Sequence, residues 1–205
     1  MSQTGQTLRD KARELLEQGK VNCIIGYEPG SLKFTTTPLI TRDKADVARL
    51  VINPFITNNL SNYLTETEGK AGIVARGCDS RSIVSLIQDN QLKRDDVFII
   101  GVPCGGVIDV RKIEKLTGMD RDGIGDIAWQ GDKAIVTVDG VKKEFPAKDV
   151  LMDDCLGCET PIPPEYDILL EAAGPLICDK DASRHLIKKL EAMPPAERWA
   201  FWQEQ

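Results

Sequence analysis

The sequence predicts an α/β protein with a mainly parallel sheet, flanking helices and a small antiparallel hairpin annex. Two continuous apolar runs, residues 71–76 and 96–103, are each followed by a helical pattern, residues 80–92 and 107–118. Continuous apolar runs are typical of parallel strands that are covered on both faces. A right-handed crossover between them would place both strands in one sheet. The order β-α-β-α therefore defines the centre of the fold.

The other elements are predicted from shorter signals. Gly19 follows the amphipathic residues 7–18, where a helix would end in a left-handed conformation. Asp139-Gly140 is the preferred pair for a two-residue hairpin turn, here between residues 136–138 and 141–145. Further strands are expected over 21–28 and 166–170, and further helices over 44–52, 56–64 and 182–193.

The length, net charge and hydropathy of the sequence indicate how many domains the protein has and which kinds of partner it is expected to lack. The 205 residues suit one domain, which we expect to span residues 1–193, with residues 194–205 as a separate aromatic tail. A net charge of −6 disfavours nucleic acid as a partner. No apolar stretch approaches the roughly 18 residues of a membrane-spanning helix, and the polar start does not resemble a signal peptide. We therefore expect a cytoplasmic protein.

Four of the six cysteines are predicted to meet at one edge of the sheet. Cys78 and Cys104 each follow a predicted parallel strand, so both should lie beyond the carboxyl ends of those strands. Cys155 and Cys158 form a CxxC chelate in the segment after the hairpin. The hairpin annex would thus carry part of a site with four thiol ligands.

The residues around these thiols suit the binding of a cofactor. Gly77, Gly105 and Gly106 would let the backbone approach an inorganic centre closely. Arg81 falls in the first turn of the helix after Cys78, where anions are bound. The helix N-termini after both strands are expected to lower the pKa of the adjoining thiols.

Four thiolates are the ligand set of a 4Fe-4S cluster or of a structural zinc ion. The single CxxC and the 26-residue separation of the other two cysteines differ from the paired knuckles of a zinc ribbon, which favours the cluster. A zinc-stabilised binding or assembly module without redox chemistry is the alternative. Thiols that hold no metal are a third interpretation, including a thiol-disulfide enzyme that uses the CxxC pair.

The remaining candidates are given structural roles. Cys23 lies in an apolar run and is predicted to be core packing, and Cys178 is also predicted to be structural. The single histidine, His185, is not expected to act as a ligand. Surface positions are expected for four basic residues outside the predicted site, Lys33, Arg42, Lys44 and Arg76.

The segments IGVPCGGVIDVRKI and CLGCETPIPPEYDILLEAAG, separated by the Asp-Gly hairpin, resemble the beta subunit family of coenzyme F420 hydrogenases and dehydrogenases. Cys104, Cys155 and Cys158 match positions of that family directly. Cys78, in ARGCDSRSI, matches a variant in relatives associated with heterodisulfide reductase. The resemblance covers roughly residues 72–174.

The resemblance implies an electron-transfer subunit of an oxidoreductase complex, with one 4Fe-4S cluster beside a flavin, usually FAD. The family passes electrons between a ferredoxin-type subunit and a hydride carrier. This chain has no CxxCxxC ferredoxin module, so we expect a separate ferredoxin-like or other iron-sulfur subunit in a hetero-oligomer. The terminal aromatic residues Trp199, Phe201 and Trp202 are predicted either to dock that subunit or to fold back on their own core.

Overall fold

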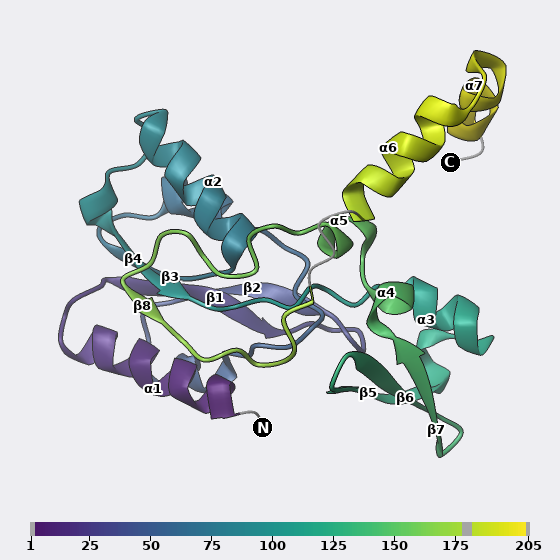
Figure 1. The fold of residues 1–205 in the computed structure, drawn as a ribbon. Helices are drawn as coiled ribbons and strands as arrows, with labels where there is room; N and C mark the ends of the chain where they lie inside the picture. Colours follow the sequence, from purple (N-terminus) through teal and green to yellow (C-terminus); the bar gives the residue numbers. More distant parts are fainter. Residues whose placement is uncertain (1–2, 178–181, 204–205) are drawn as a thin grey trace.

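A computed structural model describes residues 3–177 and 182–203 of the chain (Figure 1). Its main sheet has five strands in the order β2-β1-β3-β4-β8. Strand β2 is antiparallel to β1, and the other neighbours are parallel. The predicted α/β class, with a mainly parallel sheet, is confirmed. The strands are β1 Cys23–Pro29, β2 Thr36–Thr41, β3 Ala71–Ala75, β4 Val97–Gly101 and β8 Ile168–Leu169.

The predicted β-α-β-α unit is present at the centre of the sheet. Helix α2 (Gly77–Gln88) connects β3 to β4, which pair in parallel from Ala71 and Val97 onward. Helix α3 (Val110–Thr117) follows β4 and ends at Gly118, which takes the left-handed conformation with φ 72°. All five residues of β3 are buried, as a strand covered on both faces requires.

Helices cover both faces of the main sheet. Figure 1 shows α1 (Gln3–Glu17) on one face and α2 on the other. Leu8, Ala12 and Leu15 of α1 belong to the same hydrophobic core as Ile83 of α2. Gly19 has φ 60° just after α1, so the predicted left-handed helix end is confirmed.

The two helices expected over residues 44–52 and 56–64 are present only as shorter elements with different bounds. The chain forms short 3₁₀ helices there, η1 (Asp46–Arg49) and η2 (Leu60–Glu66). After η1 the backbone becomes extended, and the Val51 N–H donates to the carbonyl of Tyr27 in β1. Before η2 the carbonyl oxygens of Ile56 and Asn58 accept hydrogen bonds from a side chain and cannot continue a helix.

Strand β2 was not expected from the sequence. Pro38 in its interior argues against a strand, because proline cannot donate to a sheet. Strand β2 lies at the edge of the sheet, however, where its outer side needs no hydrogen bond from a neighbour. Further 3₁₀ turns are η3 (Arg94–Asp96) and η4 (Arg121–Gly123).

A second sheet has three antiparallel strands in the order β5-β6-β7. These are β5 Ile124–Gln130, β6 Lys133–Val138 and β7 Val141–Pro146. Val138 pairs with Val141, which confirms the hairpin turn at Asp139-Gly140, and β5 adds a strand that the sequence did not predict. A separate hydrophobic core joins this sheet to α3 and to α4 (Ala147–Val150).

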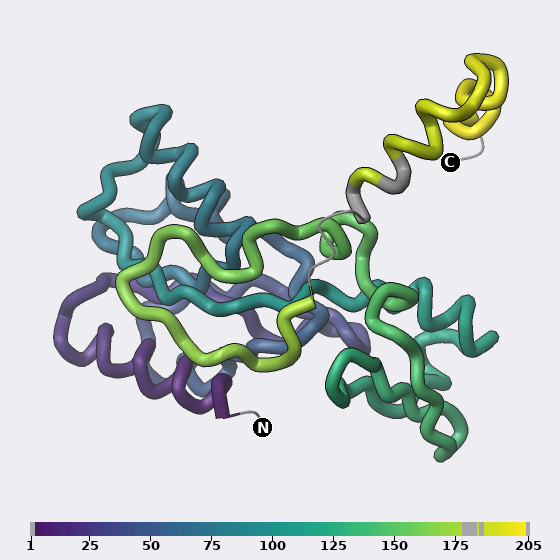
Figure 2. Tube along the Cα trace, in the orientation of Figure 1, coloured from purple at the N-terminus to yellow at the C-terminus, as the bar shows by residue number. Residues whose placement is uncertain are grey.

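The segment from α5 to the end of the described chain first passes along the main sheet and then extends away from both sheets. Helix α5 (Asp153–Leu156) is followed by an irregular segment that passes along the main sheet, forms β8 and returns (Figure 2). Helices α6 (Ala182–Ala192) and α7 (Pro195–Gln203) then project away from the body of the protein. None of the helices in the described ranges has the length and apolar character needed to cross a bilayer.

Candidate functional site

The carboxyl ends of β3 and β4 bring Cys78 and Cys104 to the same edge of the main sheet. Strand β3 ends at Ala75 and β4 at Gly101, and each cysteine follows its strand by three residues. The two strands are paired in parallel register, so their carboxyl ends lie side by side. The predicted placement of both cysteines after neighbouring strands is confirmed.

The helix after Cys104 begins later than the sequence predicts. Helix α3 starts at Val110 with Asp109 as its N-cap, so Cys104 lies in a loop and not at a helix N-terminus. The Cys104 N–H donates to the carbonyl of Pro161 at 2.8 Å. A hydrogen bond from the backbone of Gly106, not a helix dipole, lowers the pKa of the Cys104 thiol against the larger opposing effect of burial.

The segment that carries the CxxC pair is fastened to the loop after Cys104. The Met152 N–H donates to the carbonyl of Val107 at 2.9 Å, and Ile108 forms a β-bridge with Leu151. The Val107 N–H also donates to Sγ of Cys155 at 3.4 Å. These contacts join residues 107–108 to residues 151–155.

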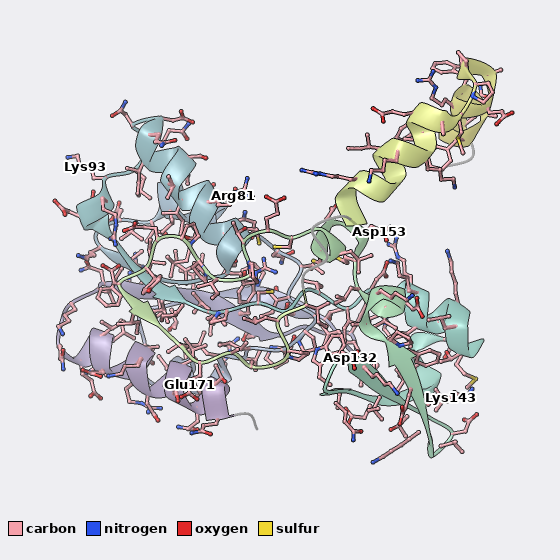
Figure 3. The ribbon with its side chains drawn as sticks, in the orientation of Figure 1. Arg81, Lys93, Asp132, Lys143, Asp153 and Glu171 are labelled. Carbon is pink, nitrogen blue, oxygen red and sulfur yellow. The ribbon has the colours of Figure 1, made fainter. Side chains whose placement is uncertain are left out.

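Lys112 of α3 adds a second attachment to the same segment. Its Nζ donates to the carbonyl of Leu151 and to the carboxylate of Asp153, both at 2.6 Å. Asp153 is the exposed first residue of α5 and is labelled in Figure 3. These contacts attach the start of α5, the helix that contains Cys155, to α3.

Burial and the charge of neighbouring thiols both act on the ionisation of Cys78, Cys104 and Cys155. Burial is the largest effect on Cys78, Cys104 and Cys155 and raises the pKa of each thiol. Negative charge on Cys104 further raises the pKa of Cys78, and charge on Cys155 or Cys158 raises that of Cys104. The pKa of Cys155 is raised by charge on Cys158 and Cys78. Each thiol therefore affects at least one thiol from another segment.

Within the residues that the structure describes, no group of three or more His, Cys, Asp or Glu side chains has the arrangement needed to hold a single metal ion.

Arg76, two residues before Cys78, is buried, so its predicted surface position is wrong. Only 6% of this residue is exposed, and its guanidinium pairs with Asp79, with Nε at 2.8 Å from Oδ2. Its other nitrogens donate to the carbonyls of Ile56 and Asn58. Burial of the charge is possible because each of the three guanidinium nitrogens donates to at least one acceptor.

The charge of Arg76 acts on the thiol site. It lowers the pKa of Cys78, Cys104 and Cys155, against the larger opposing effect of burial. The hydroxyl of Tyr27 lies 2.9 Å from the carbonyl oxygen of Asn58 and 3.3 Å from Oδ2 of Asp79, both of which can accept its hydrogen bond. The Arg76 guanidinium lies 5.6 Å from the Tyr27 ring centroid. Sequence reasoning missed this network, although an aspartate three residues after an arginine at a helix start was a usable signal.

A cavity of about 320 Å³ adjoins Cys104. Most of its lining is apolar, and the few polar groups include the side chains of Tyr27 and Arg76. Trp129 of β5 contributes an aromatic wall, so the cavity draws on both sheets. A mostly apolar cavity with a few polar groups is typical of a site for a small organic ligand.

Two of the predicted cofactor-binding glycines are needed for close packing between loops. A Cβ on Gly77 would lie 1.7 Å from the carbonyl oxygen of Thr160, and one on Gly105 would lie 1.7 Å from that of Pro175. Gly106 has φ 105°, and its added Cβ would meet Leu151 and Cys155. These glycines let the CxxC segment and the segment after β8 approach the two cysteine loops.

Replacing Gly77 with alanine is expected to displace the loop after the CxxC pair. The clash with the Thr160 carbonyl should lower the free energy of unfolding by roughly 1–3 kcal/mol in urea titrations. It should also increase the rate at which iodoacetamide labels Cys158 in the metal-free protein, measured by peptide mass spectrometry.

Gly118→Ala is the matched control for this substitution. Gly118 has φ 72° with no atom within 4 Å of its added Cβ, so we expect a strain of roughly 1–2 kcal/mol without a change at Cys158. Identical labelling of Cys158 in both variants would show that Gly77 does not position the loop.

The other predicted residues lie as follows. Arg81 is exposed on α2, where Figure 3 shows it, and it lines a shallow pocket with Cys78 and Glu165. Its anion-binding role stays a prediction. Cys23 is fully buried in β1, as predicted for core packing. The predictions for Cys178 and for the side chain of His185 lie outside the part of the structure that is described.

The chain is similar to a subunit of a known dehydrogenase. It is 25% identical over 176 residues to the F420-dependent formate dehydrogenase 1 subunit beta of Methanococcus maripaludis, an alignment that covers 78% of this chain and 44% of that protein. The chain thus spans less than half the length of that relative. No protein-family model matches the sequence.

The fold is similar to that of a chain in the F420-reducing [NiFe] hydrogenase complex of Methanosarcina barkeri. The TM-score is 0.63 at 15% sequence identity, and the match covers 92% of this chain and 71% of that chain. The resemblance predicted from the sequence is therefore supported at modest identity. Both similar proteins are parts of oxidoreductases.

Proposed function

We propose that this chain is an electron-transfer subunit of an oxidoreductase complex, in which Cys78, Cys104, Cys155 and Cys158 hold one 4Fe-4S cluster. The observation that carries the proposal is the attachment of the CxxC segment to the loop after Cys104, through the hydrogen bonds from Met152 to Val107 and from Val107 to the Cys155 sulfur and the β-bridge between Ile108 and Leu151. The similarity to a formate dehydrogenase subunit gives independent support for a redox role.

The donor set and its surroundings fit such a cluster. Four cysteine thiolates are the usual ligands of a 4Fe-4S cluster, which accepts and releases single electrons when it is bound. Backbone N–H groups of Gly106 and Val107 donate to Cys104 and Cys155, and hydrogen bonds to sulfur are among the features that set a cluster's potential. The buried charge of Arg76 would partly offset the negative charge of the thiolates.

The cavity beside Cys104 is our proposed site for a flavin, FAD by resemblance to the beta subunit family. Trp129 would offer an aromatic surface for a planar ring, and Tyr27 and Arg76 would offer polar groups. The mostly apolar lining would exclude water from the ring. The position next to Cys104 would hold the flavin close to the thiol site, so that two-electron hydride chemistry could be divided into single-electron steps.

We infer that the chain works with a separate ferredoxin-like or other iron-sulfur subunit. Both similar proteins belong to assemblies of more than one subunit. The proposed complex would pass electrons between that subunit and a hydride carrier or a hydrogenase, formate dehydrogenase or heterodisulfide-reductase type of partner.

Purification without oxygen tests the proposal directly. We expect about four irons per chain and a broad visible absorption that bleaches on reduction, because one 4Fe-4S cluster is bound. Extraction of the native protein should also release FAD. A colourless protein with one zinc and no iron per chain would contradict the proposal and support the zinc-stabilised module instead.

A further inference from the structure

Helices α6 and α7 form an arm, defined as residues 182–203, that projects away from both sheets (Figure 1). The arm begins beside the proposed cluster site, because α6 contacts α5, the short helix that contains Cys155. The Lys189 Nζ lies 5.6 Å from the ring centroid of Phe201, which links α6 to α7. The arm is therefore a folded element that starts next to the CxxC pair.

The arm presents large aromatic rings to solvent. Trp199 is 69% exposed and Trp202 is 57% exposed, and neither belongs to the two hydrophobic cores among the described residues. Of the two predictions for the tail, folding back on its own core is therefore wrong for these tryptophans. Trp is enriched at the energetically dominant positions of protein interfaces, so these rings point to a protein partner.

Basic side chains outnumber acidic ones in the described part of the arm. The chain has a net charge of −6, and Asp179, Asp181 and Glu204 flank the arm in the sequence, whereas residues 182–203 themselves contain four basic residues and two acidic ones. These residues are Arg184, Lys188, Lys189 and Arg198, and Glu191 and Glu197. A basic arm with exposed aromatic rings is complementary to an acidic protein surface.

We propose that the arm docks a separate, acidic iron-sulfur protein and holds it beside the CxxC pair. The inference rests on the proposed function, because it assumes that the partner exchanges electrons with the cysteine site. A different protein is favoured over a second copy of this chain, since both similar proteins work with other subunits. The contact between α6 and α5 would keep the partner near Cys155.

Site-specific photo-crosslinking of the full chain in its native host tests this proposal. A benzoylphenylalanine at position 199 should form one main adduct, with a protein that mass spectrometry identifies as acidic and that contains iron. The same probe at position 116 is the control, because Leu116 is 47% exposed on α3 and lies outside the arm. We expect at least tenfold more adduct from position 199 than from position 116, roughly the effect of a dominant interface residue.

Charge reversal tests the predicted complementarity. Arg184→Glu with Lys188→Glu leaves the contact between Lys189 and Phe201 in place and should reduce the adduct at least fivefold, roughly what the loss of two interface charges produces. The visible spectrum of the same preparations should be unchanged.

Several outcomes would overturn the inference. These are no adduct, an adduct with a second copy of this chain, an adduct with a protein that lacks iron, equal yields at positions 199 and 116, and no effect of charge reversal. A colourless chain that still forms the adduct with an acidic iron protein would contradict the proposed cluster while supporting the docking surface. The two proposals can therefore fail separately.

Discussion

Replacing Cys104 with serine or alanine is expected to reduce the iron bound per chain at least tenfold, to background. Cys104 lies in the loop that meets both the CxxC segment and the segment after β8, so its thiolate would join three parts of the chain through the cluster. Metal binding contributes directly to folding when ligands come from separate segments. We therefore also expect a lower thermal unfolding temperature for the variant, measured without oxygen together with iron content and visible absorption.

Cys23→Ala is the control for the loss of iron. Cys23 is fully buried in β1, where its pKa is raised by burial, and it packs in the main core. Its truncation should cost about 1 kcal/mol of stability but leave iron content unchanged. Loss of iron in Cys23→Ala with retention in both Cys104 variants would show that the ligand assignment is wrong.

The centre of the fold could be predicted because its signals are local. The apolar runs of β3 and β4 and the helical patterns after them define the parallel unit without knowledge of tertiary contacts. Glycines at 19 and 118 mark two helix ends through their left-handed backbone. The positions of Cys78 and Cys104 follow from this topology, because parallel strands place their carboxyl ends at one edge.

Elements that depend on distant partners could not be predicted in the same way. The apolar spacing of residues 56–64 suggests an α-helix, but Arg76 takes the carbonyls of Ile56 and Asn58. Strand β2 forms despite Pro38 because it lies at the edge of the sheet. Local sequence patterns do not indicate which backbone carbonyls will accept hydrogen bonds from a distant side chain. They also do not indicate which strand will lie at the edge of the sheet.

The burial of Arg76 is the clearest case of such a remote effect. An arginine after an apolar strand is usually assigned to the surface, since charged residues are rarely buried without a partner. Here the partners are Asp79 one turn later and two carbonyls from a segment about twenty residues earlier. Only the pairing with Asp79 could be predicted from the sequence, because Asp79 lies three residues after Arg76.

Replacing Arg76 with methionine is expected to lower the free energy of unfolding by about 3–5 kcal/mol, because Asp79 would remain as an unpaired buried charge. Asp79 is 0% exposed, and its carboxylate accepts from the Arg76 guanidinium at 2.8 and 3.0 Å. The measurement is urea unfolding of the metal-free chain at neutral pH, so that any effect on a bound cluster is excluded.

Two further variants separate the buried pair from ordinary surface charge. Arg94→Met removes an ion pair with Glu165 and Asp167, but the Arg94 side chain is 34% exposed, so we expect a loss of at most about 1 kcal/mol. Adding Asp79→Asn to Arg76→Met removes the unpaired charge and should restore a large part of the lost stability. If Arg76→Met costs no more than Arg94→Met, the guanidinium is not the element that joins the start of α2 to residues 56–58.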